Sequence, residues 1–323
     1  MNIGIWLVRP GSSARSKSVG QKENNHYSPI VANKAWCDET NHFLAYERNI
    51  HVGGVSSARK GKAQWGRVKN LYPKAVEEAL DRELETKIGE IFGRLLTLGS
   101  LDAGQRRLWA QFLRSQFVRT PSFIRYEEFA REALSLSDRP ACDRVGCEHC
   151  LDLHMVTGRD WMLLVAHEDD YFVRTDNPVY TTGFLEDPDS VLYYPLGPKV
   201  CFVACSMPQN WEPLAGAAVE RAVPAYALDK GGALVLNFHF CRSSDRTLII
   251  HPAHQGQISE AMFTEILGLY PQPPFDLHHL GMGDKEALME SLRRLMCEAD
   301  GRNYSSFDAS EMGPRYFPRR DDQ

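Results

Sequence analysis

The sequence predicts an α+β protein in which an antiparallel helical core, at about residues 73–136, packs with a small antiparallel sheet, at about residues 160–206. Apolar residues recur every three or four positions in the first segment, whereas short apolar runs alternate with turn residues in the second. The 323-residue chain is 43% hydrophobic and 24% charged, which is an ordinary globular composition and excludes a disordered or collagen-like chain.

The first helix of the core is expected to begin after Pro73, because proline suits the first turn of a helix. Apolar residues then repeat at helical spacing as far as Leu95, and Gly99 marks the end. A second helix is expected after Ser100 or Asp102, either of which can cap its N-terminus.

Pro121 separates the second helix from a third, which we expect to reach about Leu136. The strands of the sheet are expected in four apolar runs, of which the first two form a hairpin across 168–170: Trp161–Ala166, Tyr171–Thr175, Val191–Tyr194 and Lys199–Cys205. The segment Ala233–Pro252 is compatible with either a strand or a helix.

The predicted organisation is a single α+β domain over residues 24–300. Residues 1–23 are rich in Ser, Gly and basic side chains and predict a flexible lead-in, and residues 301–323 predict an irregular tail. Cysteines cluster within residues 140–155, which we interpret as an insertion into the domain. No window reaches the roughly 18 apolar residues of a membrane span, so we expect a cytoplasmic protein without a membrane partner.

Charge is distributed unevenly along the chain. The net charge is −5, yet residues 1–74 carry +8, which indicates either a phosphate-facing region or a basic surface that complements the acidic remainder. We expect nucleic acid to contact a basic run with Trp65 stacking on a base; the run comprises Arg59, Lys60, Lys62, Arg67 and Lys69.

If the first helix turns by 100° per residue, three carboxylates lie along one edge of its apolar face. These residues are Glu77, Asp81 and Glu85, and like charges at this spacing repel each other. A divalent metal or a general-acid site would explain them, and a solvated helix edge is the alternative.

Two polar side chains of the second helix, Gln116 and Arg119, project into its apolar arc. A buried guanidinium needs an anionic partner, which is either a carboxylate of the first helix or a substrate phosphate. Asp176, in the sequence Thr-Asp-Asn-Pro, lies where a strand ends, and is interpreted as a reactive group or as part of an Asx-turn. His26 and Tyr27 place an imidazole beside a phenol near the start of the ordered chain.

The cysteine cluster supplies soft metal ligands at knuckle-like spacing. Cys142, Cys147, Cys150 and His154 match a tetrahedral structural zinc site, and free thiols on a helix are the alternative. Catalysis is not expected there, because four protein ligands leave no open coordination position.

Five short motifs occur in a characteristic order along the chain. They are His26-Tyr27-x-Pro29, a helix bearing Glu77 or Glu78 and Glu85, Gln116-x-x-Arg119-x-Pro121, Thr175-Asp176-Asn177-Pro178 and Pro195-Leu196-Gly197-Pro198. In this order they resemble the bacterial family catalogued as domain of unknown function 4238, over roughly residues 24–250. The resemblance implies positions for a site and brings no established activity.

A site composed of His26, Tyr27, Glu85, Gln116, Arg119 and Asp176 suits phosphodiester hydrolysis. We therefore predict a hydrolase, most simply a nuclease of the toxin or phage-defence type. Two alternatives remain open. The same residues could form a buried structural network in a non-enzymatic protein-binding module, or the site of an enzyme acting on a small nucleotide-like ligand.

Overall fold

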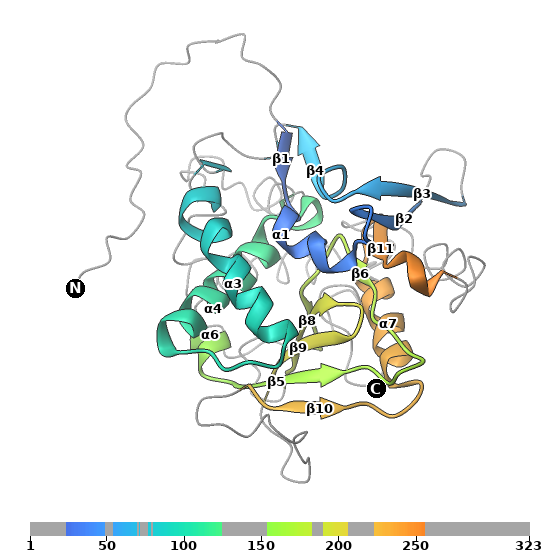
Figure 1. Ribbon diagram of the computed structural model, residues 1–323. Helices are drawn as coiled ribbons and strands as arrows, with labels where there is room; N and C mark the ends of the chain where they lie inside the picture. The colour runs from blue at the N-terminus through green and yellow to red at the C-terminus, as the bar shows by residue number, and fades with distance from the viewer. Residues whose placement is uncertain are drawn as a thin grey trace, which may run out of the picture.

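The computed structural model describes residues 24–48, 54–69, 71, 77–78, 80–124, 154–182, 190–205 and 223–255. Helices and sheets follow one another irregularly along this part of the chain, and three layers are stacked (Figure 1). The predicted α+β fold class is confirmed. None of the described helices combines the length and the apolar character that crossing a bilayer requires.

The middle layer is a five-stranded sheet with the order β10-β5-β9-β8-β7. Its strands are β5 (Asp160–Val165), β7 (Tyr180–Thr181), β8 (Leu192–Gly197), β9 (Val200–Cys205) and β10 (Ala225–Ala227). Neighbouring strands are antiparallel except β10, which pairs with β5 in parallel. The antiparallel sheet is thus present within the predicted residues, and a later segment adds a parallel edge to it.

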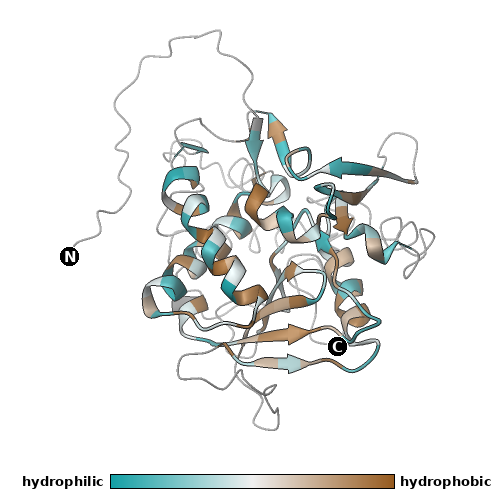
Figure 2. Ribbon diagram, in the orientation of Figure 1, coloured by the Kyte–Doolittle hydropathy of each residue, from teal (hydrophilic) through white to brown (hydrophobic). Residues whose placement is uncertain are grey.

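Both faces of this sheet are buried, as its alternating side chains show. Trp161 and Leu163 of β5 belong to the apolar core on the helical side, whereas Met162 and Leu164 belong to the core on the other side. Figure 2 accordingly shows β5 in brown along its length. A strand covered on both faces reads as a continuous apolar run, because neither set of side chains meets water.

The helical layer covers one face of the sheet, with α3 beside α4 in Figure 1. Its helices are α3 (Thr86–Leu96), α4 (Ala103–Val118) and the short α6 (His154–Thr157). Asp102 caps α4: its carboxylate accepts from the Gln105 amide at 2.9 Å, and the Gln105 side chain accepts from the Asp102 amide at 3.1 Å. The predicted start of the second helix is therefore confirmed. Residues 121–124 are helical, and the rest of the predicted third helix lies outside the described residues.

The predicted first helix is present in the described residues and ends at Leu96, but it contains a π-helical turn, η2 (Asp81–Glu85), so the assumed uniform 100° per residue does not hold there. The Thr86 amide donates to the carbonyl of Asp81, five residues back, and the Thr86 hydroxyl donates to the same oxygen at 2.8 Å. A π-turn holds one more residue than an α-turn, so it rotates everything that follows. Of the three carboxylates predicted to share one edge, Asp81 is exposed, whereas Glu77 and Glu85 are partly buried.

The third layer consists of a four-stranded sheet and helix α7 (Gly232–Ser243). The sheet has the order β3-β2-β11-β6, with strands β2 (His42–Arg48), β3 (Val55–Gly61), β6 (Arg174–Thr175) and β11 (Thr247–Ile250). The ambiguous segment Ala233–Pro252 is therefore helix first and strand afterwards.

The predicted hairpin between Trp161–Ala166 and Tyr171–Thr175 is wrong. β9 and β10 occupy both edges of β5, and β6 pairs with β11 in the other sheet. The side chain of Asn237 on α7 supplies the missing backbone partners, since it donates to the Tyr171 carbonyl at 2.6 Å and accepts from the Val173 amide at 2.9 Å. These pairings join residues far apart in sequence, which local patterns do not encode.

Two short strands, β1 (Asn24–His26) and β4 (Arg67–Lys69), form a separate antiparallel ribbon at the top of Figure 1. Short helices complete the described structure: α1 (Ile30–Asn33), η1 (Lys34–Trp36) and η3 (Pro252–His254). The turn after β1 is held by the Ser28 amide, which donates to the carbonyl of Gly66 at 3.1 Å. Gly66 has a φ of 73°, and a Cβ on it would lie 2.3 Å from the Cβ of Ser28.

Gly66→Ala should therefore destabilise the protein through both backbone strain and a steric clash with Ser28. Gly54→Ala is the matched control, because Gly54 has a φ of 80° but no atom within 4 Å of the added Cβ. We expect Gly54→Ala to cost about 1 kcal/mol from the left-handed conformation. Gly66→Ala should cost about 2 kcal/mol more from overpacking, measured by urea unfolding. Equal losses in the two variants would show that the Ser28 contact is unimportant.

Candidate functional site

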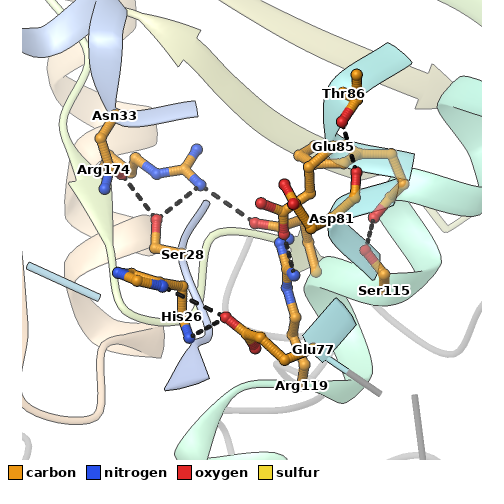
Figure 3. Close-up of polar contacts among 12 residues, drawn as sticks. His26, Ser28, Asn33, Glu77, Asp81, Glu85, Thr86, Ser115, Arg119 and Arg174 are labelled. Carbon is orange, nitrogen blue, oxygen red and sulfur yellow. Dashed lines mark hydrogen bonds and ion pairs between the residues drawn. The ribbon is translucent and has the colours of Figure 1, made fainter. Parts of the chain in front are cut away.

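A buried polar cluster lies between the helical layer and the sheets (Figure 3). At its centre are two arginines, Arg119 directly after α4 and Arg174 on β6, and both are 0% exposed. Gln116 of α4 is also fully buried and lies between them. Burying a guanidinium is costly unless acceptors surround it, so the partners of these two groups define the site.

Arg119 forms an ion pair with Glu85, with Nη1 and Oε1 2.6 Å apart. Glu85 is the last residue of the π-turn, and its side chain is 19% exposed. The extra residue of the π-turn and the end of α4 together bring carboxylate and guanidinium into contact. Of the two anionic partners predicted for Arg119, a carboxylate of the first helix or a substrate phosphate, the structure contains the carboxylate.

Arg174 is bound by neutral acceptors. Its Nη1 donates to the Pro195 carbonyl, and its Nη2 donates to Ser28 Oγ and Gln116 Oε1, each at 3.3 Å. The guanidinium lies 4.9 Å from the centre of the Tyr194 ring, where it gains a cation–π contact. Among the described residues no carboxylate lies within ion-pair distance of it. The sequence signal was a cation in the apolar run Tyr171–Thr175.

The Gln116 amide lies against both arginines, and its oxygen accepts from one or the other according to its orientation. Gln116 Oε1 accepts from Arg174 in one amide orientation, and in the other its oxygen accepts from Arg119 Nε at 2.7 Å. The described part of the cluster contains two guanidiniums and two carboxylates, Glu85 beside Arg119 and Glu77 at the exposed edge. Positive charge is therefore local to Arg174, whose described acceptors are all neutral, and burial screens it weakly.

His26 and Glu77 form a second pair at the more exposed edge of the cluster. His26 Nδ1 lies 3.3 Å from Glu77 Oε1, and the His26 backbone amide donates to the same oxygen at 3.1 Å. The two side chains are 26% and 28% exposed. Ser28, which accepts from Arg174, is two residues from His26, so the Cα atoms of Ser28 and His26 are at most about 7 Å apart. Figure 3 shows His26 turned toward Glu77.

Tyr27 points away from these groups into the apolar core. It is 6% exposed and packs against Trp65, with ring centres 6.1 Å apart. Burial raises the pKa of the Tyr27 phenol well above its usual value, so it stays protonated. Trp65 is itself 3% exposed, and its Nε1 donates to Thr247 Oγ1 at 3.1 Å. The expectation that Trp65 stacks on a nucleic-acid base is therefore wrong.

Asp176 holds a turn between α7 and β11. One carboxylate oxygen accepts from the Ser244 hydroxyl and the Asp245 amide, both at 2.9 Å, and the other accepts from the amides of Arg246 at 2.6 Å and Thr247 at 2.9 Å. Burial, and secondarily the charge of Asp245, raise the pKa of Asp176 to about 6. Among the described residues, every group that donates a hydrogen bond to the Asp176 carboxylate lies in this turn, and none belongs to the arginine cluster.

A small surface hollow has Gln116 among its lining residues. It has room for about one water molecule, and its walls include Phe117, Phe123, Asn177 and Tyr180. Asn177 Nδ2 donates to the Ser243 carbonyl at 2.7 Å, so this wall is fixed to α7. The hollow gives the buried amide contact with a cleft lined by aromatic and amide side chains.

Metal ligation at the carboxylates stays a prediction. Glu77 and Glu85 are engaged by His26 and Arg119, and the described residues include no group of three or more His, Cys, Asp or Glu side chains that could hold an ion. The predicted zinc ligands Cys142, Cys147 and Cys150 lie outside the described residues, as does the side chain of His154, so the zinc site stays a prediction.

The structure thus brings together His26, Glu85, Gln116 and Arg119 and separates Tyr27 and Asp176 from them. Arg174, Ser28 and Tyr194 join the cluster without having been anticipated. The chain matches no protein-family model, no curated protein and no solved structure. The resemblance to domain of unknown function 4238 stays a prediction.

Glu85→Gln should destabilise the fold, because it leaves the fully buried Arg119 without its carboxylate. We expect a loss of about 2 kcal/mol, below the usual cost of breaking a buried pair since Glu85 is partly exposed. Glu77→Gln is the matched control, because its partner His26 is a quarter exposed and keeps contact with water. Urea unfolding should show the smaller loss for Glu77→Gln, and a larger one would contradict the assignment.

The raised pKa of Asp176 predicts a pH dependence of stability. A carboxyl that binds its proton more tightly in the folded state contributes stability that is complete below about pH 4 and lost as the pH rises through about 6. The free energy of unfolding, relative to that of Asp176→Asn, should therefore fall from pH 4 to pH 7.

Asp38 is the control for this titration. Hydrogen bonds, first from the Thr40 side chain and then from the backbone amides of His42 and Thr40, lower the pKa of Asp38. The free energy of unfolding relative to that of Asp38→Asn should therefore not fall between pH 4 and pH 7. Parallel pH profiles for the wild type and Asp176→Asn would refute the prediction.

Proposed function

We propose that the protein is a phosphodiester hydrolase, most simply a nuclease, in which His26 is the general base. The observation that carries the proposal is the His26–Glu77 pair, partly exposed at the edge of a cluster in which the buried Arg174 has only neutral described acceptors. A hydrolase of this class needs a group that removes a proton from the nucleophile and an environment that favours negative charge on phosphorus-bound oxygens.

Glu77 would orient the imidazole ring of His26 through Nδ1. With the Nδ1 proton directed at the carboxylate, Nε2 carries the lone pair that accepts a proton from water or from a ribose 2′-hydroxyl. The His26 amide bonded to the same oxygen fixes the carboxylate relative to the backbone. Glu77 is a positioning residue in this scheme, and His26 is the catalytic residue.

Arg119 and Arg174 would act through their field. Both are 0% exposed, so they stabilise the negative charge of the phosphorane from beneath the surface rather than by grasping a phosphate. Glu85 forms an ion pair with Arg119. The charge of Arg174 would therefore contribute most, because its described acceptors are neutral and burial screens it weakly.

A non-enzymatic binding module is the second candidate. The observation that favours it is the closure of the network, because Gln116, Arg119 and Arg174 are all completely buried and bonded to one another or to neighbouring groups. In that case the cluster is a structural device, and neither His26 nor Glu77 takes part in a reaction.

His26→Ala should reduce cleavage of fluorescent single-stranded RNA or DNA by about 100-fold or more, the usual contribution of a general base. His167→Ala is the matched control, because His167 also lies near a carboxylate, with Nδ1 3.9 Å from Asp169, and is 34% exposed. The control should retain cleavage. Melting temperatures of both variants would show that the fold is preserved.

Equal cleavage by the wild type and His26→Ala would exclude His26 as the base. Absence of cleavage by the wild type on RNA and DNA, each tested with EDTA and with added Mg²⁺ or Mn²⁺, would favour the binding module. A parallel loss of activity and melting temperature in His26→Ala alone would assign the residue a structural role.

A further inference from the structure

We infer that β4 is a phosphate-binding tract, in which Arg67 and Lys69 hold neighbouring phosphates of a single-stranded polynucleotide and lead it to His26. The inference rests on the proposed function, since it names the substrate class of the same site. It is carried by the register of the β1–β4 ribbon and by the difference between neutralised and available cations on the two basic strands.

The register places the tract beside the proposed base. Arg67 pairs with His26 across the antiparallel ribbon, and Lys69 pairs with Asn24. Residues directly opposite each other in such a pair project to the same face. Asn25 shows the other face: it is 1% exposed and accepts from the Leu71 amide at 2.7 Å. The row formed by Lys69 and Arg67 therefore ends next to the imidazole.

The spacing of the two cations suits one nucleic-acid strand. Residues two apart on a strand are about 7 Å from each other, which is comparable with the distance between adjacent phosphates along an extended backbone. All three residues of β4 are exposed, and the ribbon is separate from the two larger sheets (Figure 1). A strand of nucleic acid can therefore approach both cations at once.

The basic residues of β3 differ from those of β4, because their charges are already compensated. Arg59 forms an ion pair with Asp38, and Lys60 forms one with Glu47 at 3.1 Å. Lys62, in the following turn, donates to Asn41 Oδ1 at 3.1 Å. By contrast, Arg67 and Lys69 have no carboxylate partner among the residues that the structure describes. Of the five basic residues predicted from the sequence, Arg59 and Lys60 would have to give up an ion pair to bind phosphate, whereas Arg67 and Lys69 would give up none among the described residues.

The test measures binding separately from cleavage. Fluorescence anisotropy would follow a labelled 12-nucleotide strand, as RNA and as DNA, and the corresponding duplex, over a range of NaCl concentrations. All proteins would carry His26→Ala to prevent cleavage. The tract variant is Arg67→Gln with Lys69→Gln, and the matched control is Arg59→Gln with Lys60→Gln, which removes the same charge from the adjacent basic strand.

The tract variant should bind single strands at least about 10-fold more weakly, and its slope of log K against log [NaCl] should be shallower by about 1 for each lost contact. The control should keep the parent's slope and stay within about 3-fold of its affinity. RNA and DNA bound alike would indicate backbone recognition, and tighter binding of RNA would add the 2′-hydroxyl to it. Equal losses in the two variants, no loss in the tract variant, or tighter binding of the duplex would overturn the inference.

Failure of the tract is distinguishable from failure of the hydrolase. Hydrolysis of bis(4-nitrophenyl) phosphate by the wild type, compared with His26→Ala, reports on the base without a polynucleotide. If that hydrolysis depends on His26 while the tract variant binds oligonucleotides normally, the hydrolase stands and the tract is wrong. If no diester is cleaved but binding depends on Arg67 and Lys69, the tract stands and the catalytic proposal is wrong.

Discussion

Burial of two guanidiniums between the layers is the constraint on which the rest of the structure depends. Arg119 and Arg174 are fully inaccessible to solvent. Each of their donors that lacks a protein acceptor therefore destabilises the fold, because water cannot supply the missing hydrogen bond. The acceptors come from four separate parts of the chain: Glu85, Gln116, Ser28 and Pro195. Meeting this demand fixes the helical layer, the central sheet and the segment after β1 relative to one another.

The π-turn is the local adjustment that makes the arrangement possible. It places Glu85 against Arg119, while the preceding helical residue Glu77 meets His26. Each of these two carboxylates thus has a basic partner. The cluster has a sealed interior at the arginines and an edge that touches water at His26.

Electrostatics connect that interior with the surface. Beneath the edge lies the buried Arg174 with neutral described acceptors, and at the surface the exposed Arg67 lies opposite His26 on the ribbon. By comparison, Asp176 is a carboxylate whose surroundings disfavour its charge, and its hydrogen bonds organise the turn into β11. The described polar groups therefore separate into a set that shapes the fold and a set placed to meet a ligand.

The sequence by itself determined the elements whose signals are local. Asp102 and Gln105 specify the start of α4 through reciprocal hydrogen bonds, and the apolar runs around Trp161 and Val200 specify strands of the central sheet. The side chains Gln116 and Arg119 could be recognised as buried because the helical period places them on the apolar face. A cation on such a face requires an acceptor, which anticipated the pair with Glu85.

Tertiary structure decided everything that depends on partners distant in the chain. β6 belongs to the four-stranded sheet because it pairs with β11, and Asn237 bonds the chain just before it. The parallel edge of the five-stranded sheet is β10, a strand about 60 residues after β5. The environment of Arg174 could not be read from its neighbours, because Ser28, Gln116 and Pro195 reach it only after the layers pack. Local periodicity reports which face of an element is buried, but the identity of the groups across that face is settled by the long-range packing that folding selects.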